Sequence, residues 1–409
     1  MNMPADLSST IDIFVGRQAI FDTELNVHAY ELLFRDGNVE VANVVDGNQA
    51  TSQVIINAFL EMGVEQIAQH HCAFINLTRD FLLGEIPFPL QPEKIVLEVL
   101  EDIAVDDELI SSVKRLKGEG YMIALDDFVL TKSNQQLIPL VDIIKIDLMV
   151  LSQRELVEQV AAMKQYNVDL LAEKIETKQE FELCQQLGFK YFQGYFFSRP
   201  DIVKGAQLPP NRLALLEMIA ILQDPECRFD ELELIISKDV AISYKLLRII
   251  NSSFYGLPQK VESIQKALVV LGLQALRNWV TVIGLSQIEN KPQELINISL
   301  TRAKMCELLA AEIGCEKNSA FTIGLFSMLD VLMDRPLNEL LDQLPLAEEI
   351  TGALTEYSGV LGNLLKMVVA YEQGNWVELE KVAISPAHSL RTSYLDSLAW
   401  SEEITSEIK

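Results

Sequence analysis

Short runs of branched apolar residues alternate with helix-like stretches through the first half of the chain. Amphipathic stretches over 52–67, 107–119 and 152–166 separate several of these runs. Strands that are apolar along their whole length and alternate with helices favour a parallel sheet with helices outside it. Seven or eight such units in about 200 residues predict a compact (β/α) barrel. The strand-like runs are IDIFVG, VHAYELLF, CAFINLT, KIVLEVLE, YMIALDDF, VDIIKIDL, VDLLAEKIE and FKYFQGYFF.

The pattern changes after residue 200. The stretch KGAQLPPNR contains a proline pair and indicates a linker. Beyond it the apolar residues follow a helical period without strand alternation, which predicts an all-α second domain. Helices are expected over 213–222, 229–237, 240–250 and 264–271. We therefore predict two domains, a (β/α) barrel over residues 1–203 and a helical domain over residues 204–409.

The composition is that of an acidic globular protein, with 49% hydrophobic residues and a formal net charge of −26. This charge excludes bulk nucleic acid as a partner, although a small phosphate ligand bound through a metal remains compatible with it. The five cysteines form no CxxC pair and fit a reducing cytoplasm. No signal peptide is apparent, and polar residues interrupt the apolar segment 267–285, which predicts buried helices rather than a membrane span. We expect a soluble, cytoplasmic protein.

Acidic and amide residues lie at or near the carboxyl ends of the predicted strands. In a (β/α) barrel these ends converge on one face, where catalytic residues gather. Several carboxylates close together are unfavourable unless cations lie among them, and one lysine cannot offset so many. The residues in these positions are Glu31, Asn76, Glu98, Glu101, Asp126, Asp127, Lys145, Asp147, Glu173, Glu176 and Gln193.

Oxygen ligands of this kind select hard cations such as Mg²⁺ or Mn²⁺, and the lack of cysteine and histidine at these strand ends disfavours zinc. Two such ions about 4 Å apart would activate water and clamp a phosphoryl group, with Lys145 orienting the water or stabilising charge. A simpler interpretation is that an Asp or Asn after a strand is only the N-cap of the next helix. That interpretation suits a single residue better than the whole set, because Glu is a poor N-cap and the pattern recurs on successive strands.

The chain carries, in order, the motifs YELLFR, Asn76, LEVLE, DDF, KID, AEKIET and QGYFFSRP. This ordered set, within about residues 12–200, resembles the motifs of EAL domains, the cyclic-di-GMP phosphodiesterase family with a TIM-like barrel. The resemblance implies a two-metal site of Mg²⁺ or Mn²⁺. In it Glu31, Asn76, Glu98 and Asp126 would hold the first ion, and Asp127 would bridge to or bind the second, with Asp147 and Glu173 nearby.

The same resemblance implies roles in catalysis and substrate binding. Lys145 and Glu173 would position or activate the attacking water. Gln18, in the sequence RQAIF, resembles a guanine-contacting glutamine, and Gln193 is expected to contact the substrate. Arg35 would bind a phosphate with its guanidinium fork, the alternative being an ion pair with a local acid at the surface. Loop anchors are expected at Glu101 and Glu176.

Three departures from the family pattern are visible. The triplet that names the family is Glu31-Leu32-Leu33 instead of Glu-Ala-Leu. The loop that normally contains FGTGYSS is Phe128–Asn134, FVLTKSN, with neither glycine. In the family this loop helps to order the second metal and couples to a dimer interface, so a homodimer is one oligomeric state that the resemblance implies. The proline-containing substrate segment is replaced by a polar stretch over 36–49.

From about residue 211 onward the chain resembles an HDOD domain, a non-catalytic relative of the HD phosphohydrolase fold. The match is clearest over 246–276, which contains INSSFYG and IQKALVVLG. Because no histidine lies between residues 72 and 387, metallohydrolase chemistry is not expected in this half. Asn251-Ser252-Ser253 also fits a helix-ending turn in which side chains bind local backbone groups. The expected role of the domain is to bind a protein partner or to relay a state to the barrel.

A barrel followed by an HDOD domain is the order of the YuxH-like EAL–HDOD signalling proteins of bacteria. The favoured hypothesis is a metal-dependent phosphodiesterase that opens cyclic-di-GMP to the linear dinucleotide pGpG. The alternative is a catalytically inactive receptor for cyclic-di-GMP, or a protein-interaction scaffold, that signals through the HDOD domain. A generic scaffold with a coincidental acidic set is a third hypothesis. Motility, adhesion and biofilm formation are the outputs that the family implies.

Overall fold

The computed structural model of the chain divides into two compact units, one made of Met1–Phe196 with Glu372–Trp376 and Pro386–Arg391, and the other made of Phe197–Tyr371 with Val377–Ser385 and Thr392–Lys409. The predicted boundary between residues 203 and 204 lies outside the described residues and remains a prediction. The structure describes residues 13–36, 64–84, 92–101, 103–131, 134–194, 210–224, 226–252, 255, 257, 259–288, 291–382 and 387–408.

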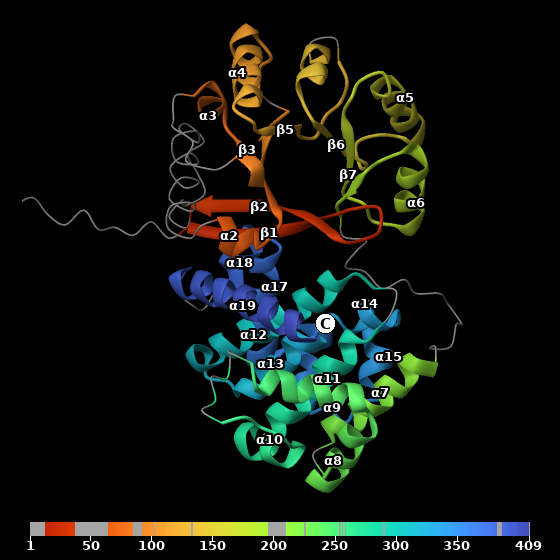
Figure 1. Ribbon diagram of the computed structural model, residues 1–409, viewed down its shortest axis with the longest axis vertical. Helices are drawn as coiled ribbons and strands as arrows, with labels where there is room; N and C mark the ends of the chain where they lie inside the picture. Colours follow the sequence, from red (N-terminus) through yellow and green to blue (C-terminus); the bar gives the residue numbers. More distant parts are fainter. Residues whose placement is uncertain are drawn as a thin grey trace, which may run out of the picture. The chain divides into compact units, whose positions relative to one another are not determined.

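Eight strands close into a barrel in chain order, which confirms the predicted fold and all eight predicted strands (Figure 1). The pairs from β2 to β8 are parallel. The strands are β1 Ile13–Phe21, β2 Val27–Asp36, β3 Cys72–Leu77, β4 Ile95–Val99, β5 Met122–Leu125, β6 Ile143–Asp147, β7 Asp169–Glu173 and β8 Tyr191–Phe192.

The first strand departs from the expected parallel sheet, because β1 runs antiparallel to both β2 and β8. Residues 22–26 join β1 to β2, and a connection this short permits a hairpin but not the crossover that parallel strands need. Asp22 holds the turn by accepting hydrogen bonds from the backbone N–H groups of Glu24 (2.8 Å) and Asn26 (2.9 Å). The prediction of a wholly parallel sheet was therefore wrong for β1.

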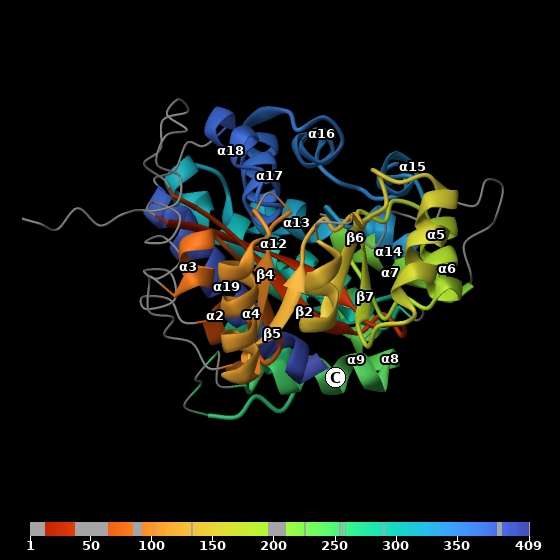
Figure 2. The ribbon, with the colours of Figure 1, turned by 90° about the horizontal axis from the view of Figure 1, so that it is seen from above.

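Helices cover the outside of the barrel. α5 Gln153–Met163 and α6 Lys178–Leu187 lie side by side outside β6 and β7, as Figures 1 and 2 show together. α4 Asp107–Gly118 and α5 confirm two of the predicted helices, whereas most of the helix predicted over 52–67 lies outside the described residues. The shorter helices of this unit are α2 Val64–Ala68, α3 Arg79–Leu83, η1 Pro92–Lys94 and η2 Gln135–Leu140.

The N-caps of these helices are not the strand-end acids. Asp106 caps α4 by accepting from the Leu109 N–H, and Ser152 and Thr177 form capping boxes at the starts of α5 and α6. The simpler interpretation of the acidic set as helix caps therefore fails for these helices, and the strand-end acids are left to serve another role.

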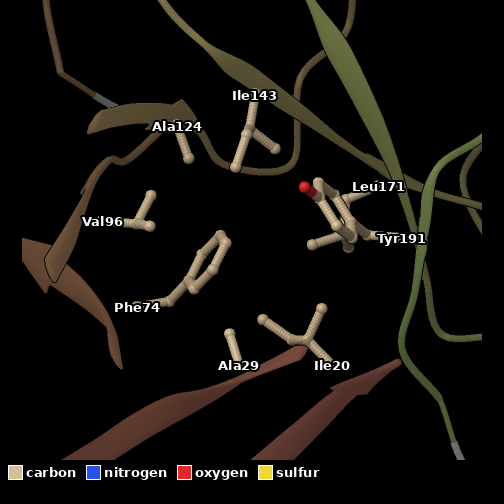
Figure 3. Close-up of a cluster of buried hydrophobic side chains, with 8 residues drawn as sticks. All are labelled: Ile20, Ala29, Phe74, Val96, Ala124, Ile143, Leu171 and Tyr191. Carbon is tan, nitrogen blue, oxygen red and sulfur yellow. The ribbon is translucent and has the colours of Figure 1, made fainter. Parts of the chain in front are cut away.

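A layer of apolar side chains closes the interior of the barrel, and we call it the floor. Each strand contributes one residue, and Figure 3 shows these side chains pointing toward one another across the barrel. No floor residue is more than 6% exposed, so the barrel is a packed core rather than a pore. The floor consists of Ile20, Ala29, Phe74, Val96, Ala124, Ile143, Leu171 and Tyr191.

The second unit is helical throughout its described residues, which confirms the predicted all-α texture. α12 and α13 pack closely at Gly324. A Cβ atom at this position would lie 2.5 Å from the backbone of Ala303, so the close approach requires glycine. α17 ends, and α18 and α19 begin, with residues that belong to the first unit. The helices are α7 Pro210–Gln223, α8 Phe229–Lys238, α9 Val240–Ile250, α10 Ile264–Leu271, α11 Leu273–Ser286, α12 Gln293–Ile313, α13 Lys317–Phe326, α14 Leu329–Met333, α15 Leu337–Leu341, α16 Glu348–Glu356, α17 Gly359–Glu372, α18 Trp376–Val382 and α19 Ala387–Ile408.

Asn251 joins the end of α9 to the chain that precedes α10. Its side chain donates to the Leu247 and Val261 carbonyls (2.7 and 2.8 Å) and accepts from the Val261 N–H (2.7 Å). This agrees with the interpretation of Asn251 as a residue that satisfies local backbone groups.

Among the described residues, none of the helices has by itself the length and apolarity needed to cross a membrane. α10 and α11 meet the criteria only as a pair, and the pair is bent by 119°. Residues 276–285 of α11 are buried, as predicted for this segment, whereas Val269 and Val270 of α10 are exposed.

Candidate functional site

A polar layer lies directly above the floor. Side chains alternate between the two faces of a strand, so the residue two positions from a floor residue points again into the barrel. In β2 to β8 that residue follows the floor residue, and in the antiparallel β1 it precedes it. The eight positions that result are Gln18, Glu31, Asn76, Glu98, Asp126, Lys145, Glu173 and Gln193, all of which the sequence analysis selected.

Lys145 lies at the centre of the polar layer. Its side chain is 0% exposed, and its ammonium faces four carboxylates. Glu31 also accepts hydrogen bonds from the amides of Asn76 (3.0 Å) and Gln193 (2.8 Å), so side chains from the seven strands β2 to β8 meet around one point. The distances from Lys145 Nζ are 2.6 Å to Glu98 Oε1, 2.7 Å to Asp126 Oδ1, 3.0 Å to Glu173 Oε1 and 3.4 Å to Glu31 Oε2.

Burial and charge shift the pKa values of these groups in opposite directions. Burial alone would lower the pKa of Lys145, but the surrounding carboxylates outweigh it and raise that pKa well above its usual value. Burial also opposes ionisation of Glu31, yet the Lys145 ammonium and the two amide hydrogen bonds lower its pKa. Burial dominates elsewhere, raising the pKa of Asp126, of Glu98 strongly, and of Glu173 to about 8.

One ammonium therefore does not compensate the carboxylates of the polar layer. Several buried oxygens have no hydrogen-bond partner in the described part of the chain: Asn76 Oδ1, both Glu98 oxygens, Asp127 Oδ1, Glu173 Oε2 and Gln193 Oε1. Glu98 Oε1 lies 2.6 Å from Lys145 Nζ, so its contact within the chain is an ion pair.

These unpartnered oxygens form the donor set that hard divalent cations prefer, so the residues fit a Mg²⁺ or Mn²⁺ ion chemically. Within the described residues, no group of three or more His, Cys, Asp or Glu side chains is already arranged to hold a metal. Lys145 Nζ lies where the four carboxylates meet, so an ion would have to share or take over those contacts.

A second, smaller charge cluster comprises Asp127, Asp147 and Lys174. The Lys174 ammonium is 2.5 Å from Asp147 Oδ2 and 3.6 Å from Asp127 Oδ2. Asp127 and Lys174 both have left-handed backbone, with φ of 41° and 56°. The sequence analysis assigned no role to Lys174, and its available signal was a cation immediately after the strand-end Glu173.

The remaining predicted residues lie away from the centre of the polar layer. Gln18 is exposed and pairs across the β-ladder with Glu31, so it lies at the rim. Glu101 is exposed and lines a cavity of ≈470 Å³, together with Asp126 and Asp127. Glu176 is exposed on the connection to α6. Arg35 is in β2, but its side chain lies outside the described residues.

The divergent loop after β5 is tied to the barrel at its described ends. Phe128 donates its N–H to the Lys145 carbonyl (2.9 Å), and Leu130 donates to the Gln159 side chain (3.1 Å). Asn134 accepts from the Thr131 N–H (2.8 Å) and donates to the Val129 carbonyl (2.9 Å). An asparagine side chain thus closes a turn that lacks glycine. Residues 132–133 and the polar segment 37–49 lie outside the described residues.

Two family models match the chain in the expected order. Residues 43–200 match the EAL domain, and residues 208–344 match the HDOD domain. The uncharacterized protein YuxH of Bacillus subtilis is 34% identical over 399 residues, covering 95% of this chain and 98% of YuxH. Cyclic di-GMP phosphodiesterase CdgJ of Vibrio cholerae is 35% identical over 401 residues, covering 96% of this chain and 93% of CdgJ.

Solved structures are similar over the barrel half at lower identity. A Klebsiella pneumoniae BlrP1 structure, described as a calcium/cy-diGMP complex, is 21% identical with a TM-score of 0.37, covering 49% of this chain and 58% of that one. An EAL domain protein from Listeria monocytogenes is 18% identical with a TM-score of 0.38, covering 48% of this chain and 94% of that one.

Proposed function

This chain belongs to the family of two-domain proteins in which an EAL domain is followed by an HDOD domain, and we propose that its barrel is a metal-dependent phosphodiesterase that converts cyclic-di-GMP to pGpG. The observation that carries the proposal is the polar layer, in which four carboxylates surround Lys145 and buried oxygens lack partners. The name of CdgJ supports the choice of substrate.

The ligands of the ion would come from the polar layer, namely Glu31, Asn76, Glu98 and Asp126. A bound Mg²⁺ or Mn²⁺ supplies Lewis acidity toward the phosphoryl oxygen and makes a bound water more acidic. Phosphodiester hydrolysis adds one water across one P–O bond, so one group must accept a proton and another must stabilise charge. Burial raises the pKa of Glu173 to about 8 in the metal-free barrel, which suits a group that exchanges protons near neutral pH, and the buried Lys145 ammonium suits stabilisation of negative charge.

Substrate contacts would come from the rim of the polar layer. The exposed Gln18 would contact a base, and Gln193 has an amide oxygen without a hydrogen-bond partner in the described part of the chain. Arg35 would bind a phosphate oxygen pair. The helical unit, in this proposal, binds a protein partner or relays a state to the barrel.

A receptor or scaffold without turnover is the second candidate. Two observations favour it: the loop after β5 has an asparagine-closed turn in place of the glycine-rich one, and Lys174 already pairs with Asp147. Either feature would affect the reaction more than the binding of a nucleotide.

Turnover of cyclic-di-GMP by the purified full-length chain, with Mg²⁺ and with Mn²⁺, tests the proposal. Glu31→Ala and Lys145→Ala should abolish pGpG formation, whereas Glu182→Ala, an exposed glutamate on α6, should leave it unchanged. No pGpG from the wild-type chain would refute the enzyme. Calorimetry on the same samples would then separate a receptor, which binds cyclic-di-GMP, from a scaffold, which does not.

A further inference from the structure

The chain itself supplies a cation to the second acidic pair. Asp127 and Asp147 are the residues that would hold or adjoin a second ion, and the Lys174 ammonium is in contact with both of their carboxylates. We infer that Lys174 takes the place of the second divalent cation, so that the barrel binds one metal ion. This inference rests on the proposed function and refines the composition of its site.

Both carboxylate oxygens of Asp147 already have a partner in the chain. Its carboxylate is buried at 4% exposure, Oδ1 accepts the Met149 N–H at 2.7 Å, and Oδ2 accepts the Lys174 ammonium. A second ion at Asp147 would have to share Oδ1 with a backbone hydrogen bond or compete with the Lys174 ammonium at Oδ2. Asp127 alone keeps an unpartnered oxygen in this cluster within the described residues, and one oxygen does not make a metal site.

The backbone at Lys174 has a left-handed conformation, and its side chain reaches Asp147. A φ of 56° is left-handed, a conformation that lysine seldom adopts, and it immediately follows the last residue of β7. Strain of this kind persists where surrounding contacts fix it. The side chain is about half exposed, so it reaches Asp147 from the solvent side of the cluster.

The charge balance differs between the two clusters. In the polar layer one ammonium faces four carboxylates, and several buried oxygens remain without partners. In the second cluster one ammonium faces two carboxylates. A divalent ion is therefore still required at the first cluster, whereas at the second it would compete with a cation that is tethered to the chain.

Counting the bound Mn²⁺ ions tests this without measuring turnover. The full-length chain is brought to saturation by equilibrium dialysis, and free Mn²⁺ is measured by electron paramagnetic resonance. We expect one ion per chain for the wild type and for Lys174→Arg, which keeps the charge. Lys174→Asn removes the ammonium and suits left-handed backbone, so it should fold and bind two ions. Lys164→Asn, at an exposed lysine that follows α5, is the matched control and should bind one.

The outcomes separate the inference from the proposed function. Two ions on the wild-type chain would overturn the inference and leave the metal-dependent reaction in place. One ion on Lys174→Asn would also overturn it, because the second site would then be absent for another reason. Lys174→Gly, which relieves the left-handed strain, should repeat the result of Lys174→Asn. No ion on the wild-type chain would remove both the metal-dependent reaction and the inference.

Discussion

Replacing Lys145 with methionine should strongly destabilise the metal-free barrel. Methionine has a similar length and fits a buried site, so the change removes the ammonium with little change in packing. Four carboxylates within 3.4 Å of Lys145 Nζ would lose the counter-charge that they share. The barrel would then have to leave them facing one another or bind protons.

The size of the effect follows from the burial of the site. Lys145 and Glu98 are 0% exposed, and removing one partner of a buried ion pair typically costs about 3–5 kcal/mol. For a domain of about 200 residues this corresponds to a fall in Tm of roughly 6–20 °C. The loss should be greatest near pH 8 and smaller near pH 5, because protonation of Glu98, Asp126 and Glu173, whose pKa values are already raised, relieves their repulsion.

The assay has to follow the barrel separately from the helical unit. Trp279 and Trp400 belong to the helical unit and Trp376 to the barrel unit, so tryptophan fluorescence does not separate the unfolding of the two. Hydrogen–deuterium exchange of peptides from β4 to β7 across a urea series gives the free energy of unfolding of the barrel. Lys190→Met is the control, since its pair with Asp169 is exposed and should contribute less than about 1 kcal/mol.

Lys145→Met should therefore lower the free energy of unfolding of the barrel clearly more than Lys190→Met does. Mn²⁺ should restore part of the stability lost in Lys145→Met, because a divalent ion supplies the missing positive charge. If Lys145→Met at pH 8 costs no more than Lys190→Met, the ammonium is not what holds the carboxylates together, and the electrostatic account of the polar layer is wrong.

Three further predictions concern pH, the divergent loop and the helical unit. Burial raises the pKa of Glu173 from 4.5 to about 8, so its contribution to stability is complete below pH 4.5 and is lost as pH rises through 8. The free energy of unfolding of the metal-free barrel should fall over that range, and Glu173→Gln should flatten the slope. Asn134→Ala removes two hydrogen bonds of the loop, costs about 1–2 kcal/mol and should speed proteolysis there; an unchanged cleavage rate would contradict this. Asn251→Ala removes the hydrogen bonds to Val261 and should lower the stability of the helical unit by about 2 kcal/mol in hydrogen–deuterium exchange of peptides from α9 to α11, whereas the exposed Asn338→Ala should have little effect.

The strands and their order could be predicted from the sequence because apolar runs of strand length report burial directly. The direction of each strand could not be predicted from those runs, because an apolar run does not show whether the strand pairs in a parallel or an antiparallel way. The informative signal for β1 was the short connection over 22–26, with Asp22 and Asn26 as turn residues, and it indicates a hairpin. A parallel prediction for β1 ignored that length.

The polar layer was predictable because residues at the carboxyl ends of parallel strands must share a face. The alternation of side chains along a strand also separates the residues that belong to the polar layer from those that do not. Glu98 is two positions beyond the floor residue Val96, whereas Glu101 is five positions beyond it and is exposed. The same spacing from Leu171 separates Glu173 from Glu176.

The centre of the site could not be read from the sequence. Every residue of the polar layer was identified, but which side chain the others surround depends on strand register and stagger around the barrel. Lys174 was missed for a different reason. Its contact with Asp147 depends on a left-handed backbone, and a lysine gives no sign in a sequence that it will adopt one.

The floor has a consequence for the order of events at the site. Because eight packed side chains block the barrel below the polar layer, ions, water and substrate reach that layer from the mouth of the barrel. A nucleotide lying across that mouth would cover whatever is beneath it. Loading should therefore be ordered, with the metal ion entering before the nucleotide and leaving after the product. Excess nucleotide added first should then slow the uptake of metal, a delay that rapid mixing in the two orders would detect.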